Sequence, residues 1–514
     1  MGRTEVRAPS WFRVRSVVLS KGALPDLPRI LTLDFMATNS HQPRHELEAL
    51  QLEQLRSLVA ELFPGNKFYS RKLNSLGITF DIASLSDFSS RFPFTTKTEL
   101  VEDQRANPPF GTNLTNPIEC YTRFHQTSGT SGAPLRWIDT PESWEWMVES
   151  WTEILQVAGV IPSDHVYFAF SFGPFIGFWL AFEAAARMGC LCVPGGGLSS
   201  SARLRSILDN RITVLCCTPT YAMRLAEVAA KEKLAIGHGQ VRTLIVAGEP
   251  GGSIPAVRTQ LQEMWPGARI FDHHGMTEVG PVTYECPARP RILHVIERAY
   301  FAEIIDPATG HSVLAGNGIK SPAVGELVLT TLGRTGSPVL RYRTGDLVKP
   351  VPQPSAQPCK CGRFELALEG GIVGRADDMV VVRGVNVYPS AVEDIVRSCA
   401  GVAEYQVELS HRQTMPELSL QVEPAADCND VAELVRRLER GFETALSLRV
   451  PITLVPMGTL PRFEMKGKRW IKKCSVWSIL LNLSKREETF QPASQTTDRR
   501  GPSPAIAGFP PLAR

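Results

Sequence analysis

HQTSGTSGAPLR, residues 125–136, contains an unbroken run from Thr127 to Gly132 in which every residue is Thr, Ser or Gly. Such a run packs poorly in a core because it has no bulky side chains. Its hydroxyl and backbone N–H groups suit an anion such as phosphate, and its glycines let the backbone approach closely. The stretch lacks the GK[ST] ending of a Walker loop. Composition leaves two interpretations open, a flexible surface loop and a phosphate loop of another type.

The overall composition is that of a large globular enzyme. The chain of 514 residues, 43% hydrophobic and 21% charged, is long enough for more than one domain. A net charge of +3 is too small for this size to indicate nucleic-acid binding. Several of the eleven cysteines lie in apolar runs such as residues 215–217, so we expect free thiols and a cytoplasmic location, with no disulfide scaffold.

The two ends of the chain and one apolar stretch are candidates for a secretory signal, a tail and a membrane span. Residues 1–40 are basic without the continuous apolar segment of a secretory signal, and we expect a poorly ordered extension. Residues 475–514, rich in Pro, Ser, Gln and Thr, are typical of a disordered tail. The uncharged residues 166–182 include Gly173, Pro174 and Gly177, so a strand, a turn and a helix starting near Ile176 are expected in place of a membrane span.

Between the ends, the hydrophobic pattern predicts an α/β fold. We expect a large multilayer N-terminal domain of β-sheets and packed helices over residues 41–374, and a small α+β domain over residues 375–474. The predicted helices cover residues 45–62, 222–233, 390–399 and 431–446, and the predicted strands cover residues 214–217, 243–247, 325–331, 380–383 and 405–409.

Further short motifs follow the Thr/Ser/Gly run along the chain. Each alone is ordinary, since a glycine-flanked acidic residue is usually a turn. They are VAGEPGG at 246–252, DHHGMTE at 272–278, LRYRTGD at 340–346, CKCGR at 359–363, GRADDM at 374–379 and LPRFEMKGKR at 460–469. In this order they resemble the adenylate-forming superfamily of acyl-CoA ligases, and within it most of all the phenylacetate–coenzyme A ligase branch.

The resemblance implies an ATP-dependent acid–thiol ligase. A carboxylate would attack the α-phosphate of ATP to give an acyl-adenylate and pyrophosphate, and coenzyme A would then displace AMP. Because a carboxylate and a triphosphate repel each other, the first step needs cations and N–H donors around the phosphates. Two alternatives stay open: transfer to a carrier-protein phosphopantetheine or another nucleophile, and a catalytically silent nucleotide-binding relative. The presence of Lys466 and Glu278 speaks against the silent relative.

The same resemblance assigns roles to single residues. Lys466 would bridge the substrate carboxylate and the nucleotide during adenylation, Thr277 would contact phosphate, and Glu278 would bind Mg²⁺, a hard cation that favours carboxylate oxygen. Asp377 would be the hinge of a mobile C-terminal domain. The remaining expected nucleotide contacts are Thr127, Ser128, Gly129, Thr130, Ser131 and Gly132 for pyrophosphate, Gly248, Glu249 and Pro250 for adenine, Asp346 for ribose, and Asp272, His274, Gly275 and Arg375.

One position departs from the family pattern. Many relatives carry Tyr where this chain has His274. A ring at that position can still stack on a base, so His274 remains a predicted nucleotide or substrate contact.

The acyl pocket is the least readable part of the sequence. Aromatic residues surround the turn at residues 173–179, and most of them are expected in the core. Phe172, Phe175 and Phe178, together with Tyr221, are predicted to form an apolar slot for an aromatic or arylacetic acid. The sequence does not identify the acid, and it leaves the oligomeric state open, with a homodimer as one candidate.

The cysteines contain a second signal. The CKC pair is too short for a typical zinc knuckle. Cys286 and His294 add two candidate ligands, and Cys₃His is a common closed tetrahedral zinc set. Some phenylacetate ligase relatives carry a structural zinc in this arrangement. We therefore expect Zn²⁺ on Cys286, His294, Cys359 and Cys361, with ordinary buried thiols as the alternative.

Overall fold

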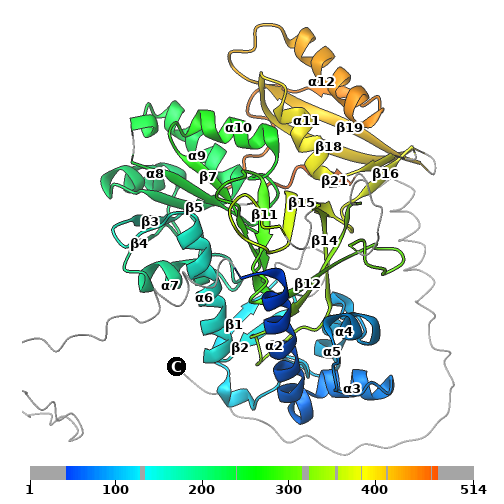
Figure 1. The fold of residues 1–514 in the computed structure, drawn as a ribbon. Helices are drawn as coiled ribbons and strands as arrows, with labels where there is room; N and C mark the ends of the chain where they lie inside the picture. The colour runs from blue at the N-terminus through cyan, green and yellow to red at the C-terminus, as the bar shows by residue number, and fades with distance from the viewer. Residues whose placement is uncertain are drawn as a thin grey trace, which may run out of the picture.

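The computed structural model describes residues 42–127, 134–238, 240–314, 323–352, 357–383, 385–412, 415–464 and 466–472. The predicted extension (residues 1–40), the predicted tail (475–514) and residues 128–132 of the predicted phosphate loop lie outside these ranges. The chain has the expected α/β fold with a C-terminal domain. In Figure 1 the N-terminal helices lie at the bottom, two large sheets in the middle and the C-terminal domain at the top. These helices are α2 (Arg44–Gly65), α3 (Lys67–Ser75), α4 (Leu85–Arg91) and α5 (Lys97–Ala106).

A parallel sheet of order β4-β3-β5-β6-β7 forms the centre of the large domain. Every residue of β5 and β6 is buried, as expected for apolar runs covered on both faces. Alternate side chains serve two hydrophobic clusters, one against α6 and α7 and the other against α8, α9 and α10. The strands are β3 (His165–Phe168), β4 (Leu191–Pro194), β5 (Val214–Cys217), β6 (Thr243–Val246) and β7 (Arg269–Asp272); the helices are α6 (Pro141–Val157), α7 (Trp179–Arg187), α8 (Ser200–Asp209), α9 (Pro219–Lys231) and α10 (Pro255–Met264).

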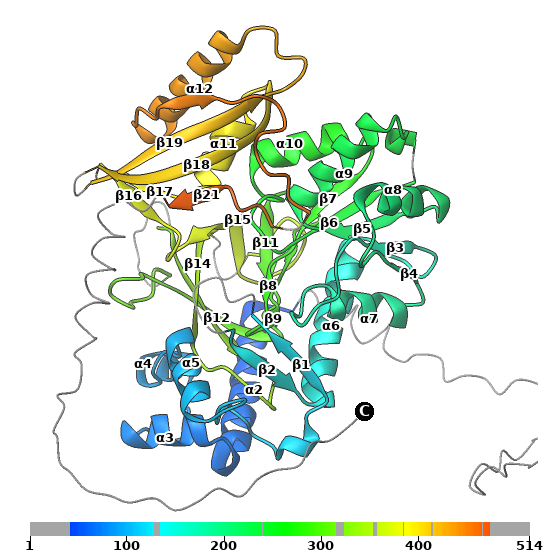
Figure 2. The same cartoon turned by 180° about the vertical axis from the view of Figure 1, so that it is seen from behind.

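An antiparallel sheet of order β10-β11-β15-β14-β13-β12 lies beside the parallel sheet (Figure 2). Its strands are β10 (Thr283–Glu285), β11 (Ile292–Val295), β12 (Tyr300–Ile305), β13 (Gly325–Thr331), β14 (Tyr342–Pro350) and β15 (Ala367–Arg375). Two small antiparallel pairs complete the large domain, β1 (Arg123–Gln126) with β2 (Arg136–Asp139), and β8 (Gly275–Met276) with β9 (Gly280–Pro281).

The C-terminal domain has a separate core. Its sheet has the order β20-β19-β18-β21, and the apolar faces of α11 and α12 pack on it. Its elements are β16 (Val380–Val382), β17 (Val385–Val387), α11 (Pro389–Arg397), β18 (Val402–Arg412), β19 (Met415–Pro424), α12 (Val431–Leu446), β20 (Ile452–Leu454) and β21 (Trp470–Lys472).

The α10 helix receives its N-terminal cap from the C-terminal domain. Its own N-cap residue, Ile254, makes no side-chain hydrogen bond, and Pro255 has no N–H to satisfy. The N–H of Ala256 instead donates to Oδ1 of Asp394 in α11, at 3.1 Å. The large and small domains are therefore in direct polar contact.

The sequence-based boundaries differ from the structure at identifiable places. The strands at residues 214–217 and 325–331 and the helix at 431–446 have the predicted bounds. The helix expected near Ile176 begins at Trp179, because Gly177 has a positive φ of 38° that an α-helix excludes. Among the described residues, no helix combines the length and the apolar character needed to cross a bilayer.

Candidate active site

The candidate site lies where the parallel strands end. Because the carboxyl ends of parallel strands meet at one edge, Thr218 after β5, Gly248 after β6 and His273 after β7 come together there. Gly248 adopts a positive φ of 95°, which a residue with a Cβ rarely does. This edge therefore collects the motifs at residues 246–252 and 272–278.

Thr127 closes the hairpin that carries the predicted phosphate loop. Its N–H donates to the carbonyl oxygen of Leu135 at 2.9 Å, and its Oγ1 accepts from the N–H of Leu135 at 3.1 Å. Residues 136–139 then pair with 123–126. The two ends of the loop are thus fixed to each other, while Ser128, Gly129, Thr130, Ser131 and Gly132 are outside the described residues.

Thr277 and Glu278 lie in the turn between β8 and β9. The buried carboxylate of Glu278 accepts from the hydroxyl of Tyr342 at 3.4 Å, and its Oε1 lies 3.2 Å from Nζ of Lys97. Lys97, at the start of α5, was not identified from the sequence, since nothing in its neighbourhood marks it. The carbonyl of Thr277 accepts a hydrogen bond from Arg334, another residue that the motifs do not reveal.

Asp346 presents one paired and one unpaired oxygen. Asp346 and Arg375 are cross-strand partners in β14 and β15, and Oδ1 accepts from Nη1 of Arg375 at 2.9 Å. Oδ2 is buried without a hydrogen bond, although Nε2 of His274, itself unpaired, lies 3.1 Å away. Both atoms are buried and face each other with no hydrogen bond to any other group of the protein, so both are available to a ligand with hydroxyl groups. Gly345 beside them has a positive φ of 76°, which favours glycine, and a Cβ there would lie 2.9 Å from Nη2 of Arg375.

Arg375 joins Asp346 to the predicted hinge residue. Its Nε donates to Oδ1 of Asp377 at 2.9 Å. Burial by itself would lower the pKa of Arg375, but the carboxylates of Asp346 and Asp377 outweigh it and raise that pKa. The guanidinium is therefore a fixed positive charge at the point where the chain passes from β15 toward the C-terminal domain.

Lys466 reaches this site from the C-terminal domain. Its Cε lies 3.5 Å from the position that a Cβ on Gly248 would take. The residue as a whole is exposed, but desolvation around its ammonium lowers the pKa of Lys466, and Arg375 acts in the same direction. The carboxylates of Glu249, Asp346 and Glu278 oppose that shift. The structure thus brings Lys466 together with predicted residues from four other motifs.

The carboxylates of Asp272 and Glu249 accept hydrogen bonds from other groups of the protein. Burial raises the pKa of Asp272 to about 7. Its Oδ2 accepts from Ser253, and its Oδ1 accepts from the N–H of His273. The two oxygens of Glu249 accept from the backbone N–H groups of Thr220 and Gly467. Each of the four carboxylate oxygens therefore accepts a hydrogen bond from within the protein.

The other predicted adenine and phosphate contacts lie around them. Pro250 is exposed beside Gly248. Gly275 begins β8, where a Cβ would lie 2.8 Å from the carbonyl oxygen of Gly280, so the turn after β7 requires a glycine.

The predicted aromatic residues divide between two cores. Phe170 makes edge-to-face contacts with Phe172, Phe175 and Phe178 at ring-centroid distances of 5.7, 5.1 and 5.5 Å. Tyr221 packs in the other cluster, on the α9 side of the parallel sheet, and its hydroxyl lies 3.0 Å from Oγ of Ser200. The structure therefore brings the three phenylalanines together and leaves Tyr221 apart from them.

The predicted zinc ligands converge beside β10 and β11. The ligand atoms of Cys286, His294, Cys359 and Cys361 all lie within 4.8 Å of one another. The closest contacts are 3.4 Å from Sγ of Cys361 to Nε2 of His294 and 3.8 Å between Sγ of Cys286 and Cys359. Nδ1 of His294 lies 3.3 Å from the carbonyl oxygen of Glu365, an arrangement that orients a metal-binding imidazole through its second nitrogen. The four donors fit a tetrahedral Zn²⁺.

Comparison with known proteins identifies what this chain resembles. The family model for AMP-binding enzymes matches residues 124–332, and the model for the C-terminal domain of AMP-binding enzymes matches residues 384–473. The phenylacetate-coenzyme A ligase of Thermus thermophilus is 32% identical over 443 residues, which cover 82% of this chain and 95% of the relative. The enzyme of the same name from Escherichia coli is 30% identical over 438 residues, with 82% and 94% covered.

Solved structures of one relative differ in how well they match. A 2-hydroxyisobutyryl-CoA ligase in the postadenylation state, with R3-HIB-AMP bound, superposes with a TM-score of 0.78 at 28% identity, covering 87% of this chain and 94% of that one. The same ligase in the thioesterification state, over the same coverage, gives a TM-score of 0.62. The arrangement of the two domains is therefore closer to the postadenylation state.

Proposed function

The chain belongs to the AMP-forming acid–coenzyme A ligases, the family of the phenylacetate-coenzyme A ligases, and we propose that the acid it activates is aromatic or arylacetic. The enzyme joins a carboxylic acid to the α-phosphate of ATP, which yields an acyl-adenylate and pyrophosphate. It then transfers the acyl group to coenzyme A and releases AMP.

The aromatic cluster after β3 carries the proposal on the acid. Phe170, Phe172 and Phe175 are only partly buried, although they contact one another edge to face. Partly exposed rings next to a ligand-binding edge offer an apolar surface to an aromatic acid. The names of the phenylacetate-specific relatives support the same substrate class.

Lys466 is the residue that we assign to the adenylation step. An ammonium beside Gly248, facing the carboxylates of Glu278 and Asp346, can contact both an incoming acid and the α-phosphate. The desolvation that lowers its pKa also strengthens its attraction to an anion in direct contact, because fewer water molecules screen the two charges. Thr277 and the residues 127–132 would hold the β- and γ-phosphates.

The ribose is assigned to Asp346. Its Oδ2 and the Nε2 of His274, which lie 3.1 Å apart, would bond to the two ribose hydroxyls, while Arg375 holds Oδ1. His274 would take this polar role in place of stacking on the base. Asp377, bonded to Arg375, would serve as the hinge between the proposed domains of residues 41–374 and 375–474.

Two metal ions are proposed. Glu278 would bind Mg²⁺, which neutralises phosphate charge when bound; its buried carboxylate already lies 3.2 Å from one cation, the ammonium of Lys97. Cys286, His294, Cys359 and Cys361 would hold a structural Zn²⁺. A cytoplasmic location is supported by the free thiols of the cysteines in the described residues. A homodimer stays one candidate for the oligomeric state.

A panel of carboxylic acids tests the substrate class. Pyrophosphate release is measured for aryl, arylacetic, short aliphatic and hydroxy acids, with and without coenzyme A, and the thioester is identified by mass. Release that is greatest with arylacetic or aromatic acids and requires coenzyme A for turnover is expected. A preference for aliphatic acids contradicts the proposed class, and release without thioester indicates a carrier protein or another acceptor.

A further inference from the structure

Glu249 links the large domain to the loop that carries Lys466. Its Oε1 accepts from the N–H of Thr220 at 2.8 Å, and its Oε2 accepts from the N–H of Gly467 at 2.7 Å. Thr220 is the second residue of α9, where an N–H has no partner within the helix. Gly467 directly follows Lys466. One carboxylate thus joins a helix N-terminus of the large domain to the residue next to the proposed catalytic lysine.

Only a carboxylate satisfies both partners. Each N–H is a donor, and an ionised carboxylate accepts at both oxygens, whereas an amide accepts at one and donates at the other. Burial raises the pKa of Glu249, and the hydrogen bonds from Thr220 and Gly467 oppose that shift. Glutamine has the same shape as glutamate but cannot accept from both N–H groups, so the contact requires the carboxylate.

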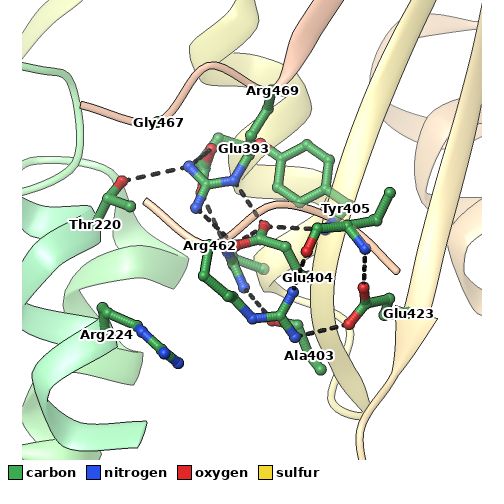
Figure 3. A network of polar contacts seen from close by, with 12 residues as sticks. Thr220, Arg224, Glu393, Ala403, Glu404, Tyr405, Glu423, Arg462, Gly467 and Arg469 are labelled. Carbon is green, nitrogen blue, oxygen red and sulfur yellow. Dashed lines mark hydrogen bonds and ion pairs between the residues drawn. The ribbon is translucent and has the colours of Figure 1, made fainter. Parts of the chain in front are cut away.

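Arg469 makes a second contact between the same segments (Figure 3). Its Nη1 donates to Oγ1 of Thr220 at 3.3 Å, across the boundary between the large domain and the C-terminal segment. Its other nitrogens are held by Glu404 of β18, with Nε–Oε1 at 2.8 Å and Nη2–Oε2 at 3.2 Å. Arg469 is nearly fully buried, and Glu393 of α11 lies 3.5 Å from Nη1. The guanidinium therefore joins Thr220 to the C-terminal core.

The space between these two contacts leaves no room for a side chain at Gly467. A Cβ at this position would lie 2.4 Å from Nη1 of Arg469 and 3.3 Å from Oγ1 of Thr220. The absence of a side chain lets the backbone after Lys466 approach Glu249 and Arg469 together.

We propose that Glu249 and Arg469 are positioning residues that hold Lys466 in the site for adenylate formation and are not needed for transfer to the thiol. The inference rests on the proposed role of Lys466. Both contacts involve residues within three positions of Lys466, and both end on Thr220 at the start of α9. They form in a domain arrangement that matches the postadenylation state of a relative better than its thioesterification state. Movement of the C-terminal domain to a different orientation would break both.

The test compares Glu249→Gln with the wild-type protein in two assays. In the first, the acid that gives the most pyrophosphate release is used to measure adenylate formation and, separately, thioester formation from the supplied acyl-adenylate and coenzyme A. In the second, which needs no substrate, trypsin cleavage after Lys466 is followed by mass spectrometry. Adenylate formation is expected to fall at least about tenfold, with thioester formation within about twofold of wild type, because one charged hydrogen bond at the lysine loop is lost. Cleavage after Lys466 is expected to be several-fold faster.

The controls separate positioning from general damage. Glu263→Gln, at an exposed position of α10, makes the same chemical change and should match wild type in both assays. Thr220→Val removes the acceptor of Arg469 without changing side-chain shape, and it should show a weaker form of the same split. It also keeps the test decisive if Glu249→Gln does not fold.

Each outcome supports or overturns the inference. An unchanged cleavage rate in both variants would show that these contacts do not hold the loop of Lys466. An equal loss of both half-reactions would show that their role is not limited to adenylate formation. If the wild type activates no acid of the panel, the proposed substrate class fails, while the cleavage assay still decides whether Glu249 holds the lysine loop.

Discussion

The guanidinium of Arg334 and the carboxylate of Asp139 form a bidentate ion pair with no exposed surface. The Nε–Oδ1 and Nη2–Oδ2 distances are both 2.7 Å, and Nη1 donates to the carbonyl oxygen of Thr277 at 2.8 Å. Asp139 ends β2, and Thr277 precedes Glu278. The pair therefore joins the hairpin of the predicted phosphate loop to the turn that carries the proposed Mg²⁺ ligand.

Replacing Arg334 by Gln is expected to destabilise the large domain strongly. It leaves the carboxylate of Asp139 buried without its counter-charge, a change that costs about 3–5 kcal/mol. Denaturant unfolding followed by tryptophan fluorescence measures the loss. Arg187→Gln, which breaks an exposed pair with Glu145, should cost less than about 1 kcal/mol. Similar losses in the two variants would show that the buried pair adds little.

Replacing Lys466 by Ala is expected to abolish adenylate formation and to spare thioester formation from a supplied acyl-adenylate. The lysine is assigned to the charge that develops as the acid attacks the α-phosphate, and that charge is absent from the second step. Single-turnover assays of each half-reaction measure the effect. Lys468→Ala, two residues away on an exposed position, is the matched control. Equal loss of both half-reactions would contradict the assignment.

Replacing Asp346 by Asn is expected to raise the KM for ATP by about 10- to 100-fold, because a charged acceptor for the ribose hydroxyls becomes a neutral amide. Initial rates of pyrophosphate release at varied ATP give the value, and Asp209→Asn, on the exposed end of α8, serves as the control. An unchanged KM for ATP would remove Asp346 from the ribose site.

The raised pKa of Asp272 predicts a pH-dependent loss of stability. The folded pKa is about 7, above the ordinary aspartate value of 3.8, so the native state binds more protons than the unfolded state between these values. Its contribution is fully present below pH 3.8 and is lost as the pH rises through about 7. In the wild type, the free energy of unfolding should fall between pH 5 and 8, and Asp272→Asn should make that fall smaller by about 2–3 kcal/mol. Denaturant unfolding of both proteins at the two pH values measures it; parallel profiles would contradict the shift.

Purified protein is expected to contain one zinc ion per chain, and chelation is expected to lower its Tm. The ion would join the turn between β10 and β11 to residues 359–361, so its removal frees both segments. Cys361→Ser should reduce the zinc content, and Cys428→Ser, in the C-terminal domain, should not. Substoichiometric zinc together with an unchanged Tm after chelation would favour ordinary buried thiols.

The sequence predicted elements with a strong local pattern and missed elements that depend on distant partners. The α12 helix was predicted with its observed bounds because Leu434, Leu438 and Phe442 repeat on one face. The strands β20 and β21 have only three residues each and are partly exposed, so no local alternation marks them. They exist because they pair in parallel with β19 and β18.

The same division holds in the site. Motif residues such as Asp346 and Lys466 were named from the sequence, and the structure brings them together. Lys97, Asp139 and Arg334 were not, because each acts through contacts with residues far away in the chain, which a single sequence does not reveal. Phe172, Phe175 and Phe178 are close in the sequence and all contact Phe170 in the structure, but the sequence could not show that Tyr221 lies on the opposite side of the sheet.

The cap that Asp394 provides to α10 makes one backbone amide sensitive to the orientation of the whole C-terminal domain. While α11 lies against α10, the N–H of Ala256 is bonded to a carboxylate, and rotation of the C-terminal domain away from α10 returns it to solvent. Its deuterium exchange rate then reports the fraction of time spent in each orientation. The exchange rate of this one peptide group near the start of α10 therefore measures how the protein divides its time between the domain orientations of the two chemical steps.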